Sequence, residues 1–190
     1  MKLILTRHGE TVENQKGIMQ GHLPGNLSKQ GIEQARKLAL RLKDEKIKAI
    51  YSSDLKRAVD TAKEIARYHK NIQINFVQDL RETDLGSFTG KCSKDIDFDY
   101  RPDDVEGAAS MQKRAKKILD EAYNKYPDKT VLFVGHNGIN KAVISVILNK
   151  PSKDMDKIES QHNTSISIFE IKEDKKHIVH LMNCVKHLKK

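Results

Sequence analysis

Side chains that could act on a phosphate ester follow four short apolar segments of this sequence. They are Arg7 and His8 after residues 2–6, Arg57 after residues 47–51, Arg81 and Glu82 after residues 72–77, and His136 with Asn137 after residues 130–134. Guanidinium groups neutralise and orient a phosphoryl group through bidentate contacts. A neutral imidazole keeps a free lone pair near pH 7 and can attack phosphorus, and a carboxylic acid can protonate the oxygen that leaves.

The elements that must position these residues alternate between apolar strands and amphipathic helices. Helices are expected to begin at Ser28, Asp54 and Ser110, and a fourth is expected over 138–148. Strands are expected over the four apolar segments and again over 164–171 and 176–185, where the last two would form a hairpin. This alternation predicts an α/β fold, a three-layer sandwich with a mostly parallel central sheet, one antiparallel strand and helices on both faces. In such sheets a ligand binds beyond the carboxyl ends of the parallel strands.

Length and charge narrow the class of protein. The 190 residues suit a single domain over 1–190, with a short lid-like excursion at about 91–109 that fits neither helical nor strand periodicity. Lysine and arginine outnumber aspartate and glutamate by 35 to 26, a balance of +9 that suits anionic partners.

Cysteine content and hydropathy point to a cytoplasmic protein that binds no membrane. Two cysteines are too few for a disulfide framework, and no secretory signal or apolar run of about 20 residues is evident. Secreted, membrane-embedded and fibrous proteins are therefore not expected.

The segment from Leu5 to Thr11, with the sequence LTRHGET, resembles the signature of the histidine phosphatase superfamily, in its phosphoglycerate-mutase-like branch. Further blocks of the resemblance follow in order along most of the chain: Asn14, residues 19–21, 27–31 with 34–35, 51–58 with 61–62, 80–86 with Gly90, and 134–138. Arg-His-Gly alone would occur by chance in roughly 2% of chains of this length, so the ordered blocks carry the resemblance.

The resemblance implies a role for nine residues. His8 would be the nucleophile that becomes phosphorylated, and Glu82 the proton donor, although Glu10 and Asp84 lie close in sequence and compete for that role. The remaining residues would surround the phosphate or the substrate: Arg7, Arg57 and His136 the phosphate, and Asn14, Gln20, Gly21 and Asn137 the substrate. The family implies no metal and no cofactor, and a small phosphorylated metabolite as partner.

Two reactions share such a pocket, and the sequence favours hydrolysis through a phosphohistidine over a cofactor-dependent phosphoglycerate mutase. A mutase must exclude water, and mutases of the family generally carry a longer insertion than the 54 positions from Glu82 to His136. The sequence departs from the family pattern in segments that face the substrate in relatives, at residues 17–18, 26–28 and 105–107. Substrate specificity therefore cannot be transferred.

A basic nucleic-acid-binding protein is the alternative from another class. The chain has few aromatic side chains on which bases could stack, with five Phe, five Tyr and no Trp. Binding of nucleic acid is therefore not expected. A homodimer is compatible with the sequence, which does not determine the oligomeric state.

Overall fold

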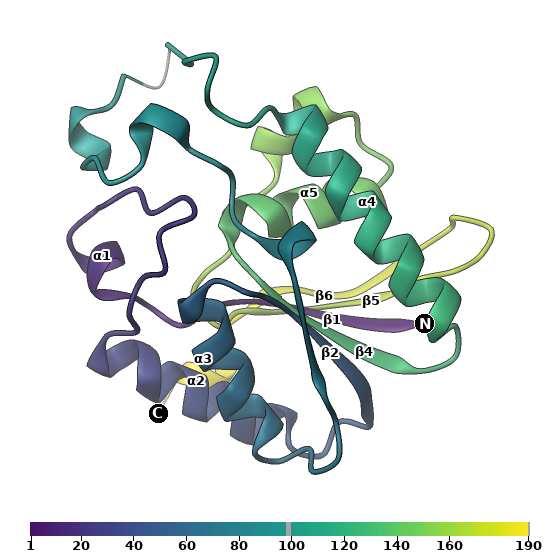
Figure 1. Ribbon diagram of the computed structural model, residues 1–190. Coiled ribbons are helices and arrows are strands. Elements are labelled where there is room, and N and C mark those ends of the chain that lie inside the picture. Colours follow the sequence, from purple (N-terminus) through teal and green to yellow (C-terminus); the bar gives the residue numbers. More distant parts are fainter. Residues whose placement is uncertain (98–99, 190) are drawn as a thin grey trace.

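The computed structural model describes residues 1–97 and 100–189, which are built around a six-stranded sheet with the order β3-β2-β4-β1-β5-β6 (Figure 1). The strands are β1 (Lys2–Arg7), β2 (Ile47–Ser53), β3 (Ile74–Val77), β4 (Thr130–Gly135), β5 (Ile166–Glu170) and β6 (Ile178–Cys184). All neighbouring pairs among β1 to β4 are parallel, whereas β5 is antiparallel to β1 and to β6. The sheet therefore contains one strand that runs against the other five, as the sequence predicts.

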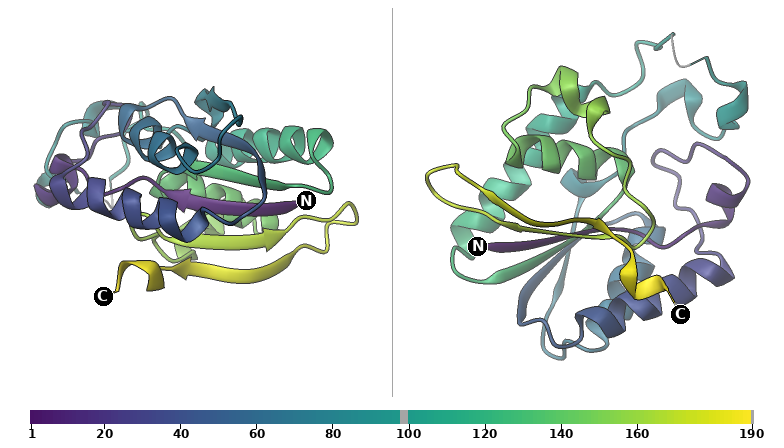
Figure 2. Two further views of the ribbon diagram at one scale, coloured as in Figure 1. Left: turned by 90° about the horizontal axis from the view of Figure 1, so that it is seen from below. Right: turned by 180° about the vertical axis from the view of Figure 1, so that it is seen from behind.

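Helices cover both faces of the sheet, which gives the expected three layers (Figures 1 and 2). The helices are α1 (Val12–Gln15), α2 (Lys29–Leu42), α3 (Lys56–Ala66), α4 (Ala108–Lys125) and α5 (Asn137–Ile147). Short 3₁₀ turns span Gln78–Leu80, Gly86–Phe88, Ser93–Asp95, Ser152–Lys157 and Lys186–Leu188. Helices α2 and α3 lie on one face, and α4 and α5 lie on the other. None of the helices within the described ranges is long and apolar enough to cross a membrane.

The central strands are apolar almost throughout because each has a helical layer on both sides. Side chains alternate between the two faces along β1: Leu3 and Leu5 pack in the core that includes α4 and α5, and Ile4 packs in the core that includes α2 and α3. Burial on both faces fixes the register of β1 between β4 and β5, and this register places the end of β1 at the site described below.

Some helix and strand boundaries differ from those expected. Ser28 does cap α2, with its Oγ accepting a hydrogen bond from the Gly31 amide at 3.0 Å. The start expected at Ser110 is wrong, because α4 begins at Ala108 and the Ser110 hydroxyl donates instead to Glu106 at 3.0 Å. The carboxylate of Asp54 binds Arg81 at 2.6 and 2.7 Å and caps nothing, so α3 begins two residues later than expected. The third strand also begins two residues later, at Ile74.

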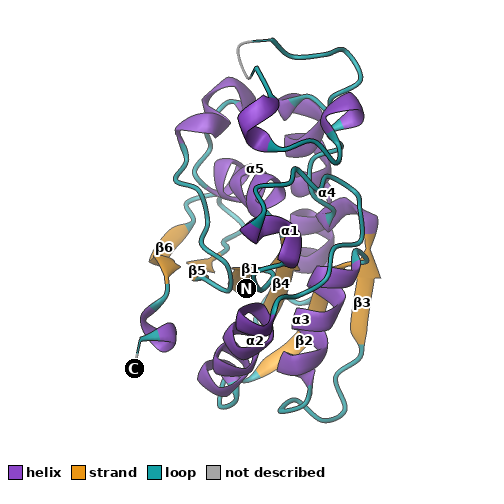
Figure 3. Cartoon of the chain, turned by 90° about the vertical axis from the view of Figure 1, so that its left-hand side faces the viewer, coloured by secondary structure: helices purple, strands orange, loops and turns teal. Residues whose placement is uncertain are grey.

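The lid-like excursion expected at about 91–109 lies partly outside the described residues, at 98–99. It is shorter than expected at its end, because α4 already begins at Ala108. At its start, residues 90–93 run alongside residues 17–19: the Met19 amide donates to the Lys91 carbonyl at 2.9 Å, and the Gly90 amide donates to the Met19 carbonyl at 2.7 Å. Figure 1 shows these loops and α1 together beyond one end of the sheet, on the left, and Figure 3 views the molecule from that side. Both the lid function and the single-domain organisation remain predictions.

Candidate active site

A pocket of about 220 Å³ lies at the carboxyl ends of the parallel strands. Its lining brings together residues from widely separated parts of the chain: Arg7, His8, Asn14, Ile18, Met19, Gln20, Gly21, Arg57, Glu82, Thr83, Leu85, Asn137 and Gly138. Eight of the nine residues predicted from the sequence are in this set. The ninth, His136, is fully buried beside it, with its ring centroid 5.0 Å from that of His8. A larger cavity of about 650 Å³ between α4, α5 and the β5–β6 hairpin contains none of the nine.

His8 follows β1 directly and is held by backbone contacts on several sides. Its amide donates to the Gly135 carbonyl at 3.1 Å, and its carbonyl accepts from Asn163 Nδ2 at 2.9 Å. The imidazole Nδ1 lies 2.7 Å from the Gly9 carbonyl oxygen, and Nε2 lies 3.3 Å from the Nε of Arg57. A carbonyl can only accept and a guanidinium can only donate, so Nδ1 carries the proton and Nε2 presents its lone pair.

Burial lowers the pKa of His8 well below its ordinary value of 6.5, and the charges of Arg7 and Arg57 lower it further. The ring is therefore neutral at physiological pH. A neutral imidazole with its lone pair on Nε2 is the form that can act as a nucleophile.

His136 is the N-cap residue of α5 and takes the opposite tautomer. Arg57 Nε donates to its Nδ1 at 3.1 Å, which places the ring proton on Nε2. This Nε2 is buried and has no hydrogen-bond partner among the described residues. Burial, together with the nearby charge of Arg57, lowers the pKa of His136 well below 6.5. His136 thus offers a neutral N–H donor beside the ring of His8.

Two guanidinium groups supply the positive charge of the pocket. Arg57, in the first turn of α3, is 1% exposed and donates to the carbonyls of Gly21, at 2.9 Å, and Leu23. Burial lowers its pKa to about 10, so it stays charged at pH 7. Arg7 donates through Nη1 to the Gln161 carbonyl at 2.8 Å, while its buried Nε has no partner among the described residues. The pair can neutralise an anion at the position that His8 faces.

Glu82 follows the 3₁₀ turn Gln78–Leu80 and lines the same pocket. Its Oε1 accepts from the amide of Gly138, in the first turn of α5, at 2.9 Å and from the Thr83 amide at 3.0 Å. Neither acidic competitor lines the pocket. Glu10 accepts from the Ser28 hydroxyl at 2.7 Å and from Gln15 at 2.8 Å, and Asp84 lies in a separate groove. Of the three carboxylates, only that of Glu82 belongs to a residue that lines the pocket.

The four residues expected to contact substrate also lie around the pocket, and the side chains of three of them form hydrogen bonds within the protein. Asn14 completes the capping box of α1 with Thr11, and Gln20 donates through Nε2 to the Thr11 hydroxyl at 2.9 Å. The Oδ1 of Asn137 accepts from the Gln161 amide at 2.8 Å. Gly21 has φ +49° and passes close to Thr89 and Leu85, a position where a side chain would be strained.

Five lining residues were not predicted as site residues: Ile18, Met19, Thr83, Leu85 and Gly138. Two residues that hold the site from outside the lining were not predicted either. Gln161 joins Arg7 to Asn137 through its backbone, and Asn163 holds the backbone of His8. Both lie in the loop before β5, which follows no parallel strand, so the strand-end criterion does not reach them. Among the described residues, no group of three or more His, Cys, Asp or Glu side chains is arranged to hold a metal ion.

Comparison with known proteins finds relatives that match nearly the whole chain. A phosphoglycerate mutase-like protein 4 of Arabidopsis thaliana is 31% identical over 98% of this chain and 86% of its own length. A metal-independent phosphoserine phosphatase of the same plant is 32% identical over 98% and 83%. Phosphoserine phosphatase 1 of Hydrogenobacter thermophilus is 32% identical over 99% and 94%.

A solved structure and a family model also match nearly the whole chain. The structure of Bacillus stearothermophilus YhfR superimposes with a TM-score of 0.91 over 99% of both chains, at 28% identity. The family model described as the histidine phosphatase superfamily (branch 1) matches residues 3–184. The chain therefore belongs to the histidine phosphatase superfamily.

Proposed function

We propose that this chain is a phosphomonoesterase that hydrolyses small phosphorylated metabolites through a phosphohistidine on His8, without a metal. The observation that carries the proposal is the proton arrangement of His8. Its Nδ1–H is committed to the Gly9 carbonyl, and its Nε2 lone pair lies beside the guanidinium of Arg57 in the pocket. The phosphatase names of the relatives, one of which is called metal-independent, support the same reaction.

In the first half of the reaction, His8 Nε2 attacks phosphorus in line with the ester oxygen. The N–P bond forms as the P–O bond to the alcohol breaks, and the carboxylic acid of Glu82 gives its proton to the departing oxygen. Arg7, Arg57 and the Nε2–H of His136 stabilise the charge on the three peripheral oxygens. The amides of Gly138 and Thr83 hold the Glu82 carboxyl by one oxygen, which leaves the other for proton transfer.

In the second half, water attacks the phosphohistidine from the side that the alcohol has left. The carboxylate of Glu82 takes a proton from this water, the N–P bond breaks, and inorganic phosphate leaves. His8 recovers its lone pair on Nε2, and Glu82 is again protonated for the next cycle.

The pocket favours a small leaving alcohol. A volume of about 220 Å³ must hold the phosphoryl group as well, and the remaining wall includes the apolar side chains of Ile18, Met19 and Leu85. Phosphoserine, the substrate in the names of two relatives, is of this size. We therefore propose that the substrate is a phosphate ester of an alcohol with a few carbon atoms. We also propose, from the sequence, a cytoplasmic protein with neither nucleic acid nor membrane as partner. A homodimer remains a prediction.

A panel of small phosphomonoesters tests the proposal directly, with the enzyme kept in excess chelator. Release of inorganic phosphate should be readily measured for some members, and 3-phosphoglycerate should be isomerised far more slowly than the best substrate is hydrolysed. Turnover only after addition of a divalent metal would contradict the proposal. Isomerisation much faster than hydrolysis would show a mutase instead.

A further inference from the structure

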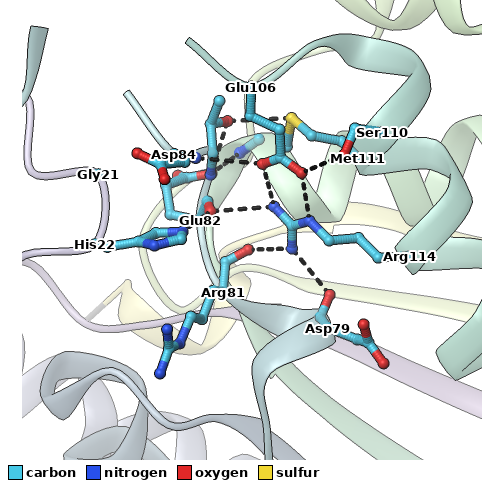
Figure 4. A network of polar contacts seen from close by, with 12 residues as sticks. Gly21, His22, Asp79, Arg81, Glu82, Asp84, Glu106, Ser110, Met111 and Arg114 are labelled. Atoms are coloured by element: carbon cyan, nitrogen blue, oxygen red, sulfur yellow. Dashed lines mark hydrogen bonds and ion pairs between the residues drawn. The ribbon is translucent and has the colours of Figure 1, made fainter. Parts of the chain in front are cut away.

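Arg114 of α4 and Glu106, which lies just before that helix, form an ion pair that is largely shielded from solvent. Arg114 Nε and Nη2 donate to the two carboxylate oxygens of Glu106 at 2.9 and 2.8 Å, a bidentate arrangement (Figure 4). The side chains are only 15% and 14% exposed. Removing two charges from water costs free energy, and an ion pair often repays that cost only in part. A buried pair of this kind is therefore better explained if it also holds other groups in place.

The remaining donors of Arg114 reach the backbone that carries Glu82. Its Nη1 donates to the carbonyls of Asp79 and Arg81 at 2.9 and 2.6 Å, and its Nη2 donates to the carbonyl of Glu82 itself at 3.1 Å. Figure 4 shows the guanidinium facing these three carbonyls in a row. One planar cation therefore fixes the chain immediately before and at the proposed proton donor.

Glu106 fixes the same chain after the proton donor. Its Oε2 accepts from the Asp84 amide at 3.2 Å, and its backbone amide donates to the Asp84 carbonyl at 2.8 Å. On the opposite side, His22 Nε2 lies 2.9 Å from the Glu82 carbonyl, and the neighbouring Gly21 carbonyl accepts from Arg57. The segment 79–84 is thus tied to α4 and to the loop that Arg57 holds.

The carboxyl group of Glu82 has few contacts of its own. Among the described residues, its hydrogen bonds come from the Gly138 amide and from Thr83, and all use Oε1. Its distance from a bound ester is consequently set by the Gly138 amide together with the backbone of residues 79–84. A shift of about 1 Å in that backbone would spoil proton transfer without removing any group from the pocket.

We infer that Arg114 and Glu106 are positioning residues for Glu82, which hold the proton donor at the working distance from the leaving oxygen. This inference rests on the proposed function, in which Glu82 is the acid. Neither side chain lines the pocket, so both act through the backbone of residues 79–84.

Leaving-group dependence separates positioning from a merely structural role. The leaving group of an alkyl phosphate is a poorly stabilised alkoxide, so its departure needs a proton from the acid. The leaving group of p-nitrophenyl phosphate is a stable phenolate, which can depart without that proton. The variant Arg114→Met should lose about 10- to 100-fold in kcat/KM for an alkyl phosphate such as phosphoserine. For p-nitrophenyl phosphate the loss should stay below about threefold. The milder Glu106→Gln, which keeps the shape of the side chain, should show the same selectivity to a smaller degree.

Two further variants complete the experiment. Glu82→Gln removes the acid itself and so sets the largest difference in loss between the alkyl phosphate and p-nitrophenyl phosphate. The double variant of Glu82→Gln with Arg114→Met should be no slower than Glu82→Gln alone, because Arg114 acts through Glu82. Lys117→Met is the matched control: it removes the ion pair of 2.7 Å from α4 to Asp79, one turn along the helix, and leaves the carbonyls of residues 79–82 untouched. This variant should change kcat/KM by no more than about twofold for either substrate.

Equal losses for both substrates in Arg114→Met and Glu106→Gln would overturn the inference and show a structural pair. Additive losses in the double variant would do the same. If Glu82→Gln itself shows no dependence on the leaving group, the assignment of the acid fails as well, and this outcome identifies the proposed function as the source of the failure.

Discussion

At the scale of single residues, His8 and His136 are neutral because they are buried beside two guanidinium groups, and this makes stability depend on pH. Both pKa values are lowered well below 6.5 in the folded chain, mainly by burial. Below about pH 6.5 the unfolded chain binds protons at these positions and the folded chain does not, so acid favours unfolding. Each histidine should cost about 1.4 kcal/mol of unfolding free energy per pH unit until its folded pKa is reached.

Urea unfolding at pH 7.5 and 5.5 measures this effect, and His8→Gln isolates one histidine. The variant should lose less unfolding free energy between the two pH values than the wild type, by on the order of 1 kcal/mol. Equal losses would mean that His8 titrates normally in the folded protein, contrary to its burial at 2% exposure.

At the scale of elements, the start of α2 lies against the loop that carries His8, and Gly31 is where they meet. A Cβ at Gly31 would collide with the carbonyl oxygen and backbone of Glu10. That backbone cannot move aside without displacing the loop that carries His8. Alanine normally stabilises a helix relative to glycine by about 1 kcal/mol. Here we expect Gly31→Ala to destabilise by about 1–3 kcal/mol in urea unfolding, because overpacking outweighs helix propensity.

Gly107→Ala provides the comparison for that measurement. Gly107 is the N-cap residue of α4 and has φ −72°, and a Cβ added there would meet no atom within 4 Å beyond its own chain neighbours. Its substitution should change the unfolding free energy by less than about 1 kcal/mol. A Gly31→Ala protein as stable as the wild type would contradict the close packing of α2 on the loop.

The elements also show what sequence reasoning can reach. Strand ends are readable because a parallel sheet places their following residues at one edge, and this criterion alone brings Arg7, His8, Glu82 and His136 together. Helix starts are harder to predict. The Oγ of Ser28 caps α2 while its hydroxyl donates to Glu10. The carboxylate of Asp54 is instead bound by Arg81, a partner distant in sequence, and Ser110 lies inside α4, where its hydroxyl donates to Glu106.

Residues that act through the backbone are not found from the sequence for a related reason. Arg114 and Glu106 look like ordinary charges of a helix and a loop, and only the folded chain shows their guanidinium and carboxylate around residues 79–84. Gln161 and Asn163 reach the site from a loop that follows no parallel strand. The side chains that could do chemistry can be predicted from their positions after parallel strands. The hydrogen bonds that hold them cannot, because they depend on long-range packing.

At the scale of the whole molecule, the site exists only when distant parts of the chain have come together around β1 to β4. Its residues come from the ends of β1 and β4, the turn after β3, the start of α3, and loops as far apart as residues 14 and 161. The central position of β1, between β4 and the antiparallel β5, holds His8 at the middle of this edge. Net charge of +9 suits an anionic substrate, and two of those positive charges lie inside the pocket.

The most direct test of the account is to trap the intermediate on His8. Enzyme mixed with a small phosphomonoester and quenched in alkali within the first turnover should carry phosphate on the peptide that contains residue 8. This phosphate should be lost on brief treatment with acid, as expected for a phosphohistidine, and His8→Asn should carry none and show no turnover. Rapid hydrolysis with no phosphate on His8, or turnover retained in His8→Asn, would contradict the account.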